Sequence, residues 1–369
     1  MASIQKRPDG RWRARYRDTD GREHARHFTR KVDGQRWLDE VTASVVTGQY
    51  VDPKAGRVTF RQYAESWRAA QVHRPSSAAH VETMLRRHAY PVFGDRAVSN
   101  VRPSEVQSWV KGLALAPSTV HVLHGIVSAV FRAAVRDRMI TVSPCDSTKL
   151  PRKVRTKVVP LPVDAVDGLA DAVPPQYRAL VVLCAGTGLR QGEAFGLTED
   201  RVNFLRRSLE VDRQLIGSVN GRAKFGPPKT AASIRTVPLP TVVAEALAEH
   251  LRIYGAGPDG LLFVGDNDVA LRRPWFSRHV WRPAVAAVKS APAGTGMHDL
   301  RHFYASLLIR HGESVKVVQA RLGHATAAET LDTYSHLWPD SDDTTRAAID
   351  SVLGKINRDA DSLRTETSP

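Results

Sequence analysis

The chain has 369 residues, of which 42% are hydrophobic and 25% are charged, and these proportions predict a soluble globular protein of two or three domains. Lysine and arginine total 53 against 38 acidic residues, and the formal net charge of +15 favours a polyanionic partner such as nucleic acid. Two cysteines exclude a disulfide scaffold and fit a reducing cytoplasm. The sequence lacks the apolar runs expected of a membrane span or a signal peptide, so we expect no membrane association.

Residues 1–57 predict a small module of three strands and one helix. Basic and apolar side chains alternate over residues 10–17, so a strand there places the basic ones on one face. Asp20-Gly21 is a hairpin signal before a strand over residues 22–29, and residues 32–47 have the apolar spacing of a helix. The basic face could be a solvated edge, but we expect it to contact DNA because its like charges repel one another unless they are neutralised. Its side chains are Arg11, Arg13, Arg15 and Arg17.

Residues 58–148 predict an all-helical domain whose apolar stripes form a core and carry no chemistry. Proline, glycine and capping residues divide this segment into separate helices. The expected helices are one that begins at the capping box of residues 59–62, one over residues 77–88 that is broken off by Pro91 and Gly94, one over about residues 103–113, and a long one after Pro117.

Residues 149–157 hold five basic residues and no acidic one, and they predict a linker that follows the phosphate backbone of DNA. The largest unit covers residues 158–354 and is mostly helical with a strand region at residues 200–238, whereas residues 355–369 form a polar tail that we expect to be flexible. The predicted fold class is therefore mainly α with small β elements (α+β). The linker residues expected to contact DNA are Arg152, Lys153, Arg155 and Lys157.

Four clusters in the largest unit contain residue types that could carry chemistry, although each is a weak signal alone. The first is a glycine-rich turn that opens a helix and could bind an anion, but its spacing is not that of a nucleotide-binding loop. The second places a lysine among the turn residues of the strand region. The clusters are residues 185–193, Pro228-Lys229-Thr230, residues 298–302, and Leu322-Gly323-His324 followed by residues 333–336.

The third cluster, His-Asp-Leu-Arg-His, has the histidine spacing of a zinc-binding helix. However, Arg301 would lie one turn from His298, beside any bound cation, and zinc would need a third ligand. We therefore expect no metal ion and no other cofactor, and a metalloprotease is a remote alternative.

Taken in order, the four clusters resemble the tyrosine recombinase (phage integrase) family. The family pattern runs as an arginine in a TGLR-x-x-E turn, a lysine in a β-hairpin, H-x-x-R, L-G-H and a nucleophilic tyrosine. The resemblance implies that residues 1–57 are an arm-site DNA-binding module, residues 58–148 a core-type DNA-binding domain, and residues 158–354 the catalytic domain of the tyrosine recombinase fold. The residues that fill the catalytic positions are Arg190, Lys229, His298, Arg301, His324 and Tyr334.

The chemistry of a phosphodiester explains these residue types. Arg190 and Arg301 can clamp the non-bridging oxygens of a pentacovalent transition state. The hydroxyl of Tyr334 has an ordinary pKa of about 10 and needs activation. We expect His298 to be the base that accepts its proton and Lys229 to be the acid that protonates the leaving 5′-oxygen.

The other polar residues of the clusters have lesser expected roles. His324 can donate a hydrogen bond to the scissile phosphate. Glu193 is expected to support the site rather than to react. We expect His302, His336 and Trp338 to be structural.

The resemblance implies a site-specific recombinase that integrates or excises a phage or mobile element at attachment sites in duplex DNA, through a 3′-phosphotyrosine intermediate. It also implies a homo-tetramer on DNA in the cytoplasm of a bacterial host, and it allows an excisionase and a host DNA-bending protein as accessory partners. Two alternatives stay open at this stage. A DNA-binding regulator would bind a specific sequence without cleavage, and a type IB topoisomerase-like enzyme would share the chemistry without site specificity.

Overall fold

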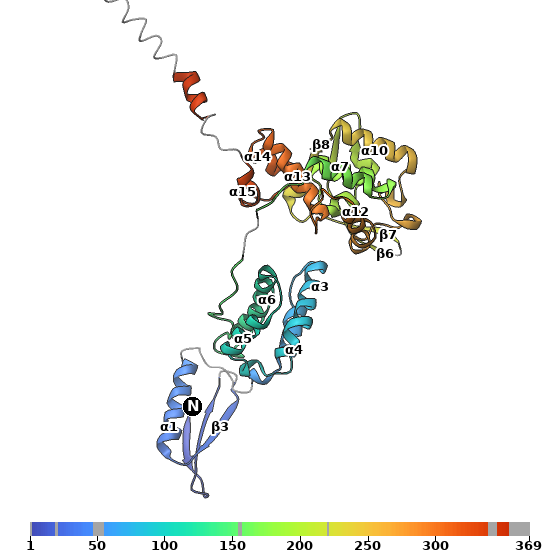
Figure 1. Ribbon diagram of the computed structural model, residues 1–369. Helices are drawn as coiled ribbons and strands as arrows, with labels where there is room; N and C mark the ends of the chain where they lie inside the picture. Colours follow the sequence, from blue (N-terminus) through green and yellow to red (C-terminus); the bar gives the residue numbers. More distant parts are fainter. Residues whose placement is uncertain are drawn as a thin grey trace, which may run out of the picture. The chain divides into compact units, whose positions relative to one another are not determined.

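The computed structural model describes residues 2–18, 21–46, 55–153, 157–219, 221–338 and 345–353 (Figure 1). The chain divides into two compact units, Met1–Arg155 and Thr156–Pro369. Arg155 of the predicted linker and the predicted tail of residues 355–369 lie outside the described residues. The fold is mainly helical with small antiparallel sheets, which confirms the predicted fold class.

The first unit begins with an antiparallel sheet of three strands covered by one helix. Ala14 and Tyr16 on the central strand are buried and pack with Leu38 of the helix, so the predicted alternation is confirmed. The arginines of this strand point to the opposite face. In the strand order β1-β2-β3, the elements are β1 (Ser3–Lys6), β2 (Trp12–Arg17), β3 (Glu23–Phe28) and α1 (Lys31–Val46).

The rest of the first unit is helical and has its own core. The predicted capping box is present, because the Gln62 backbone N–H donates to Thr59 Oγ1 and the Thr59 N–H donates to Gln62 Oε1, both at 3.3 Å. Phe60 and Phe131 are fully buried with their rings 5.0 Å apart. The helices are α2 (Phe60–Ala69), α3 (Pro75–Met84), α4 (Tyr90–Phe93), α5 (Pro103–Gly112) and α6 (Pro117–Arg136).

Helix α6 is, within the described residues, the one helix long and apolar enough to cross a membrane. Its apolar face, which includes Leu123 and Val127, lies in the core of the helical region. Packing within this core therefore accounts for its hydropathy.

The prediction that Pro91 breaks the second helix of this region is wrong. A π-helical turn over Leu85–Ala89 joins α3 to α4, and the helix continues through Pro91 to end at Gly94. The Tyr90 N–H donates to the Leu85 carbonyl, which lies five residues earlier in the chain. The backbone hydrogen bonds therefore depart from the α-helical pattern just before Pro91. A proline lacks the N–H that a regular helix requires, and a π turn shifts the backbone to accommodate it.

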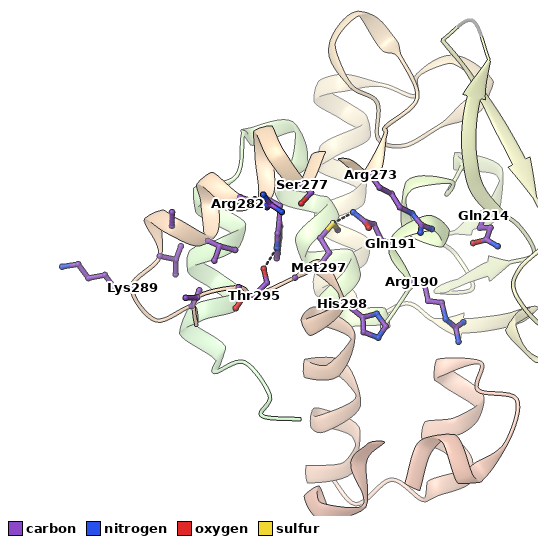
Figure 2. A pocket seen from close by; sticks show the side chains of 18 of the residues that line it. Arg190, Gln191, Gln214, Arg273, Ser277, Arg282, Lys289, Thr295, Met297 and His298 are labelled. Carbon is purple, nitrogen blue, oxygen red and sulfur yellow. Dashed lines mark hydrogen bonds between the residues drawn. The ribbon is translucent and has the colours of Figure 1, made fainter. Parts of the chain in front are cut away.

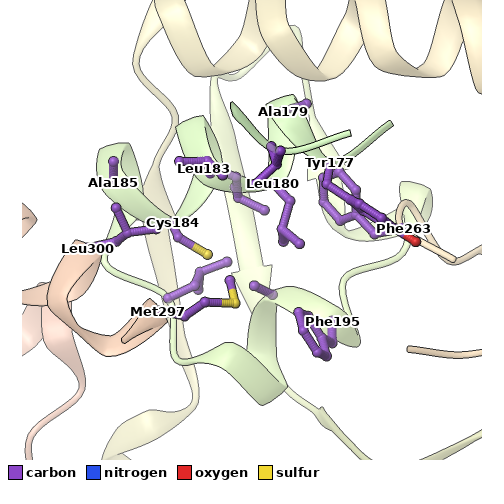
Figure 3. Packing of buried hydrophobic residues seen from close by; sticks show 14 of the residues in the cluster. Tyr177, Ala179, Leu180, Leu183, Cys184, Ala185, Phe195, Phe263, Met297 and Leu300 are labelled. Atoms are coloured by element: carbon purple, nitrogen blue, oxygen red, sulfur yellow. The ribbon is translucent and has the colours of Figure 1, made fainter. Parts of the chain in front are cut away.

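The second unit is built around helix α8, which packs against α13, α10 and α7. Figure 3 shows Leu180 and Leu183 of α8 in one buried cluster with Phe195 of α9 and Leu300 of α13. The helices are α7 (Val163–Ala172), α8 (Arg178–Thr187), α9 (Gln191–Phe195), α10 (Thr241–Tyr254), α11 (Arg273–Phe276), α12 (Arg282–Ala287), α13 (Met297–Arg310), α14 (Val315–Leu322) and α15 (Ala327–Tyr334).

Two small antiparallel sheets occupy the strand region that the sequence predicts. One has the order β4-β5-β8, and the other is the hairpin of β6 and β7. The strands are β4 (Val202–Asn203), β5 (Ser208–Val211), β6 (Gln214–Val219), β7 (Arg222–Gly226) and β8 (Arg235–Pro238).

Candidate active site

The turn between α8 and α9 places Arg190 in the site. Gly188 ends α8 in a left-handed conformation, with φ of 65°, which glycine adopts without strain. Arg190 then caps α9, and its guanidinium joins three separate segments of the chain. Its Nη1 donates to Glu193 Oε1 at 3.0 Å and to Ser233 Oγ at 3.2 Å, and its Nη2 donates to the Gly323 carbonyl at 3.2 Å.

Glu193 is buried between two arginines. Its Oε2 accepts hydrogen bonds from the Arg190 backbone N–H at 3.0 Å and from Arg235 Nη2 at 2.9 Å. Burial alone would raise the pKa of Glu193, but the two neighbouring cations outweigh it and lower the pKa below its usual range. The carboxylate therefore stays ionised and orients both arginines, which agrees with the supporting role expected for it.

Arg235 does not belong to any motif of the sequence, but its side chain is buried beside the site, at 6% exposure. Besides its bond to Glu193, its Nε donates to the Arg321 carbonyl at 2.8 Å and its Nη1 to the Ser233 carbonyl at 2.9 Å. These bonds tie β8 to the end of α14, where the Leu-Gly-His segment begins. A basic residue at the start of a half-buried strand, six residues after Lys229, was the available signal.

Arg301 lies on α13 and is only 1% exposed. Its Nη1 donates to the Gly188 carbonyl at 2.7 Å and its Nη2 to the Leu322 carbonyl at 2.6 Å. Burial and the nearby Arg190 lower the pKa of Arg301 to about 9, which leaves the guanidinium charged at neutral pH. Arg301 therefore holds the turn between α8 and α9 and the Leu-Gly-His turn to each other.

Tyr334, at the end of α15, is also only 1% exposed. Its hydroxyl lies 2.7 Å from Nδ1 of His302. Burial raises the pKa of Tyr334 to about 12, although Arg301 opposes this shift. His302, which is expected to be structural, is thus the imidazole in contact with the predicted nucleophile, and it lies one helical turn beyond His298 on α13.

His298 and His324 occupy different positions around this pair. His298 is exposed at the start of α13, and its ring lies edge-on to that of His302 at 4.7 Å. The surrounding protein atoms still remove much of its hydration, and with His302 and Arg301 they lower the pKa of His298 to about 4. His324 is buried, its Nδ1 lies 2.8 Å from Thr330 Oγ1, and its ring is parallel to that of Tyr334 at 6.4 Å. Burial and Arg301 lower the pKa of His324 to about 4 as well.

An open cleft of about 1120 Å³ is lined by Arg190 and His298 of the candidate site (Figure 2). The described residues that line it include no aspartate or glutamate. Lys229 is exposed at its edge, but it follows β7 by three residues instead of lying in the β6–β7 hairpin turn, so the predicted hairpin placement is wrong. The basic side chains of the lining are Arg190, Lys229, Arg273, Arg282, Lys289 and, when protonated, His298.

The arginines predicted to bind DNA in the first unit are exposed or half-buried. Arg13 and Arg15 share Glu23 of β3 as a partner, at 3.5 Å and 3.8 Å. The basic face is thus partly neutralised within the protein by a cross-strand contact, which the alternation of residues 10–17 does not predict. Of the predicted linker residues, Arg152, Lys153 and Lys157 are exposed.

The described residues contain no group of three or more histidine, cysteine or acidic side chains placed to hold a metal ion. His298 and His302 share one face of α13, and Arg301 lies between them in the sequence. The charge of Arg301 disfavours a cation beside this pair.

Three family models match the chain. They are described as phage integrase, N-terminal domain, over residues 2–47, phage integrase central domain over residues 60–150, and phage integrase family over residues 160–340. A putative prophage phiRv2 integrase of Mycobacterium tuberculosis is 28% identical over 347 residues, with 90% of each chain covered. The tyrosine recombinase XerC of a Methylobacterium species is 33% identical over 206 residues, which cover 52% of this chain and 58% of that protein.

The chain is also similar to solved structures. It matches the Tn1549 transposon integrase in complex with transposon right-end DNA, with a TM-score of 0.66 and 22% identity, over 80% of this chain and all of that one. It matches a lambda integrase tetramer bound to a Holliday junction with a TM-score of 0.57 and 18% identity, over 88% of this chain and 96% of that one. These likenesses concern the fold.

Proposed function

Because the chain belongs to the phage integrase family of tyrosine-type site-specific recombinases, we propose that it cuts and rejoins duplex DNA with Tyr334 as the nucleophile. The observation that carries this assignment is the convergence of distant segments on one buried tyrosine. Arg190 and the Gly323 carbonyl, 133 residues apart, are hydrogen bonded, and Arg301 ties the same two turns together. Tyr334 lies against α13, the helix that holds Arg301.

In the proposed step, the Tyr334 oxygen attacks the scissile phosphorus. A bond forms between that oxygen and phosphorus, and the bond from phosphorus to the 5′-oxygen breaks. Lys229, at the edge of the cleft, supplies the proton that the leaving oxygen needs. Arg190 and Arg301 face the negative charge that develops on the non-bridging oxygens. The 3′-phosphotyrosine retains the energy of the phosphodiester, so rejoining requires no nucleotide cofactor.

The charge of the cleft supports DNA as the substrate. Five lysine or arginine side chains line it, and acidic side chains are absent from the described lining. Such a surface attracts a phosphate backbone and would repel an acidic residue of a protein partner.

A trapping experiment tests the nucleophile. On a nicked suicide substrate, the wild-type chain should form a protein–DNA adduct that survives boiling in detergent, and the adducted peptide should contain Tyr334. Tyr334→Phe should form none while it keeps its DNA affinity. Tyr304→Phe removes the hydroxyl of another buried tyrosine and should leave the adduct intact. A wild-type chain that forms no adduct on any attachment site would favour a DNA-binding regulator instead.

We also propose that the chain acts as a homo-tetramer at attachment sites, in the cytoplasm of a bacterial host. The proposal is supported by the lambda integrase tetramer on a Holliday junction, whose fold this chain shares. Tyr334 and Arg190 belong to one site within one chain, so each protomer should cleave with its own tyrosine. A mixture of Tyr334→Phe with Arg190→Ala should therefore stay inactive, and restored cleavage would mean that the tyrosine is donated across an interface.

Cleavage should persist in excess EDTA. The proposed transition state is stabilised by guanidinium groups, and the step described above has no place for a metal ion. Loss of cleavage in EDTA that zinc alone restores would support the zinc alternative for residues 298–302.

A further inference from the structure

We propose that His302, and not His298, accepts the proton of Tyr334 during strand cleavage. The inference rests on the proposed function and adds a catalytic residue to it. Its starting point is the contact between Tyr334 Oη and His302 Nδ1, at 2.7 Å. This distance is typical of a hydrogen bond between a hydroxyl and a ring nitrogen.

Geometry separates His302 from the two other imidazoles near Tyr334. His298 is turned toward the open cleft and meets His302 edge-on, with ring planes at 86°. The His324 ring lies parallel to the Tyr334 ring, and its Nδ1 faces Thr330. A nitrogen accepts a hydrogen bond in the plane of its ring, so a parallel ring at 6.4 Å is badly placed to take this proton.

The surroundings of His302 favour a neutral ring. Partial burial lowers the pKa of His302, Asp299 opposes this shift, and Arg301 adds to it. At neutral pH the ring can therefore carry one hydrogen on Nε2 and offer Nδ1 as an acceptor. Arg301 also opposes the rise in the pKa of Tyr334, so the same guanidinium disfavours a charged imidazole and favours a phenolate.

The Tyr334 O–H bond breaks and its proton passes to His302 Nδ1, while the oxygen forms its bond to phosphorus. The electron pair of the bond from phosphorus to the 5′-oxygen leaves with that oxygen, which takes a proton from Lys229. In the rejoining step, the 5′-hydroxyl gives its proton to Lys229 as it attacks phosphorus. The bond between phosphorus and the Tyr334 oxygen breaks, and the imidazolium of His302 returns its proton to that oxygen.

Two substitutions separate proton transfer from positioning. His302→Asn places an amide oxygen near the position of Nδ1, so it can still accept a hydrogen bond from Tyr334 but cannot take its proton. His302→Ala removes both abilities. Both variants should lose about 100-fold to 10,000-fold in the rate of adduct formation on a suicide substrate. His302→Asn should keep the circular dichroism spectrum and the DNA affinity of the wild type.

A modified substrate identifies the step at which His302 acts. Sulfur in place of the bridging 5′-oxygen is a good leaving group that needs no acid, so this substrate should restore cleavage by Lys229→Ala. It should not restore cleavage by His302→Asn, because that variant lacks the acceptor for the tyrosine proton. Replacement of Tyr334 by a fluorotyrosine, whose phenol is more acidic, should instead restore part of the rate in His302→Asn.

Several outcomes would overturn the inference while leaving Tyr334 as the nucleophile. They are a wild-type rate in His302→Asn, rescue of His302→Asn by the sulfur substrate, and a higher rate in His302→Ala, which would make His302 a restraint on the tyrosine. If Tyr334→Phe still forms an adduct, the proposed function itself fails.

Discussion

The arginines of strand β2 and those around Tyr334 have the same chemistry in opposite surroundings. The side chains of Arg13 and Arg15 are 41% and 39% exposed, and their contacts to Glu23 are long, at 3.5 Å and 3.8 Å. Arg301 is 1% exposed and the Arg235 side chain 6%, and each donates short hydrogen bonds to fixed backbone carbonyls. Exposed arginines can adapt to a DNA backbone and release counterions, whereas buried ones set the geometry of a site.

The largest effect is expected for Arg301→Ala. The substitution removes the donors of two buried carbonyls, Gly188 and Leu322, and each unpaired carbonyl costs about 1–3 kcal/mol. We expect no adduct on a suicide substrate. In urea, the free energy of unfolding of the catalytic unit should fall by about 3 kcal/mol or more.

Arg15→Ala is the matched control for that experiment. Its exposed contact to Glu23 is worth at most about 1 kcal/mol, and its hydrogen bond from Nε to Ser3 Oγ, at 2.8 Å, about 1 kcal/mol. The loss of both should leave cleavage at a minimal crossover site intact. If Arg301→Ala and the wild type had equal free energies of unfolding, the buried arginines would stabilise the fold no more than the exposed ones do.

A smaller effect with a defined pH dependence is expected for Glu193→Gln. The pKa of Glu193 is lowered in the folded chain, so its ionised form stabilises the fold above the usual carboxyl pKa of about 4.3. That stabilisation is lost as the pH falls through the folded pKa. At pH 7, Glu193→Gln should be less stable by about 1.5–3 kcal/mol, since it loses charged hydrogen bonds to Arg190 and Arg235.

Urea titrations between pH 7 and pH 3 provide the measurement. The difference between the wild type and Glu193→Gln should shrink as the solution is acidified. A constant difference over this range would show that the carboxylate charge does not stabilise the buried arginines.

Local patterns account for the parts of the fold that the sequence predicts correctly. The alternation in β2 and the capping box at Thr59 depend on neighbouring residues only, and both are present. Pro91 does not break the helix, because a π turn precedes it and accommodates the missing N–H. This turn forms where Leu85 and Ala89 are buried in the helical core. Such a turn depends on packing between helices that are distant in the sequence.

The candidate site divides in the same way. The order of motifs identifies which residues belong to it, and six of them can be named from the sequence. The choice of His302 over His298 as the partner of Tyr334 depends on where the packing of α15 against α14 places the Tyr334 side chain, and the spacing of the motif contains no signal for it. Arg235 has only a weak signal, a basic residue at the start of a strand, because its role comes from the approach of β8 to the end of α14.

The exposed arginines should contribute to the salt dependence of the DNA-binding constant. Replacement of Arg11, Arg13, Arg15 and Arg17 by alanine should reduce the slope of log binding constant against log salt concentration by up to about one unit per lost phosphate contact. This holds for long attachment-site DNA, whereas binding and cleavage at a minimal crossover site should not change. An unaltered footprint on the long DNA would exclude this face as a DNA-binding surface.

The smallest effect is expected for Glu23→Gln, which tests whether this carboxylate weakens the binding of DNA to the exposed basic face. Glu23 lies close to Arg13 and Arg15, where it offsets part of their charge and would face the phosphates of bound DNA. The substitution keeps the size of the side chain and removes the charge, so binding to long attachment-site DNA should tighten by up to about fivefold at low salt. The gain should fade as salt screens the charges. Weaker binding would mean that Glu23 holds these arginines in a required geometry, and the exposed face would then behave like the buried site around Tyr334.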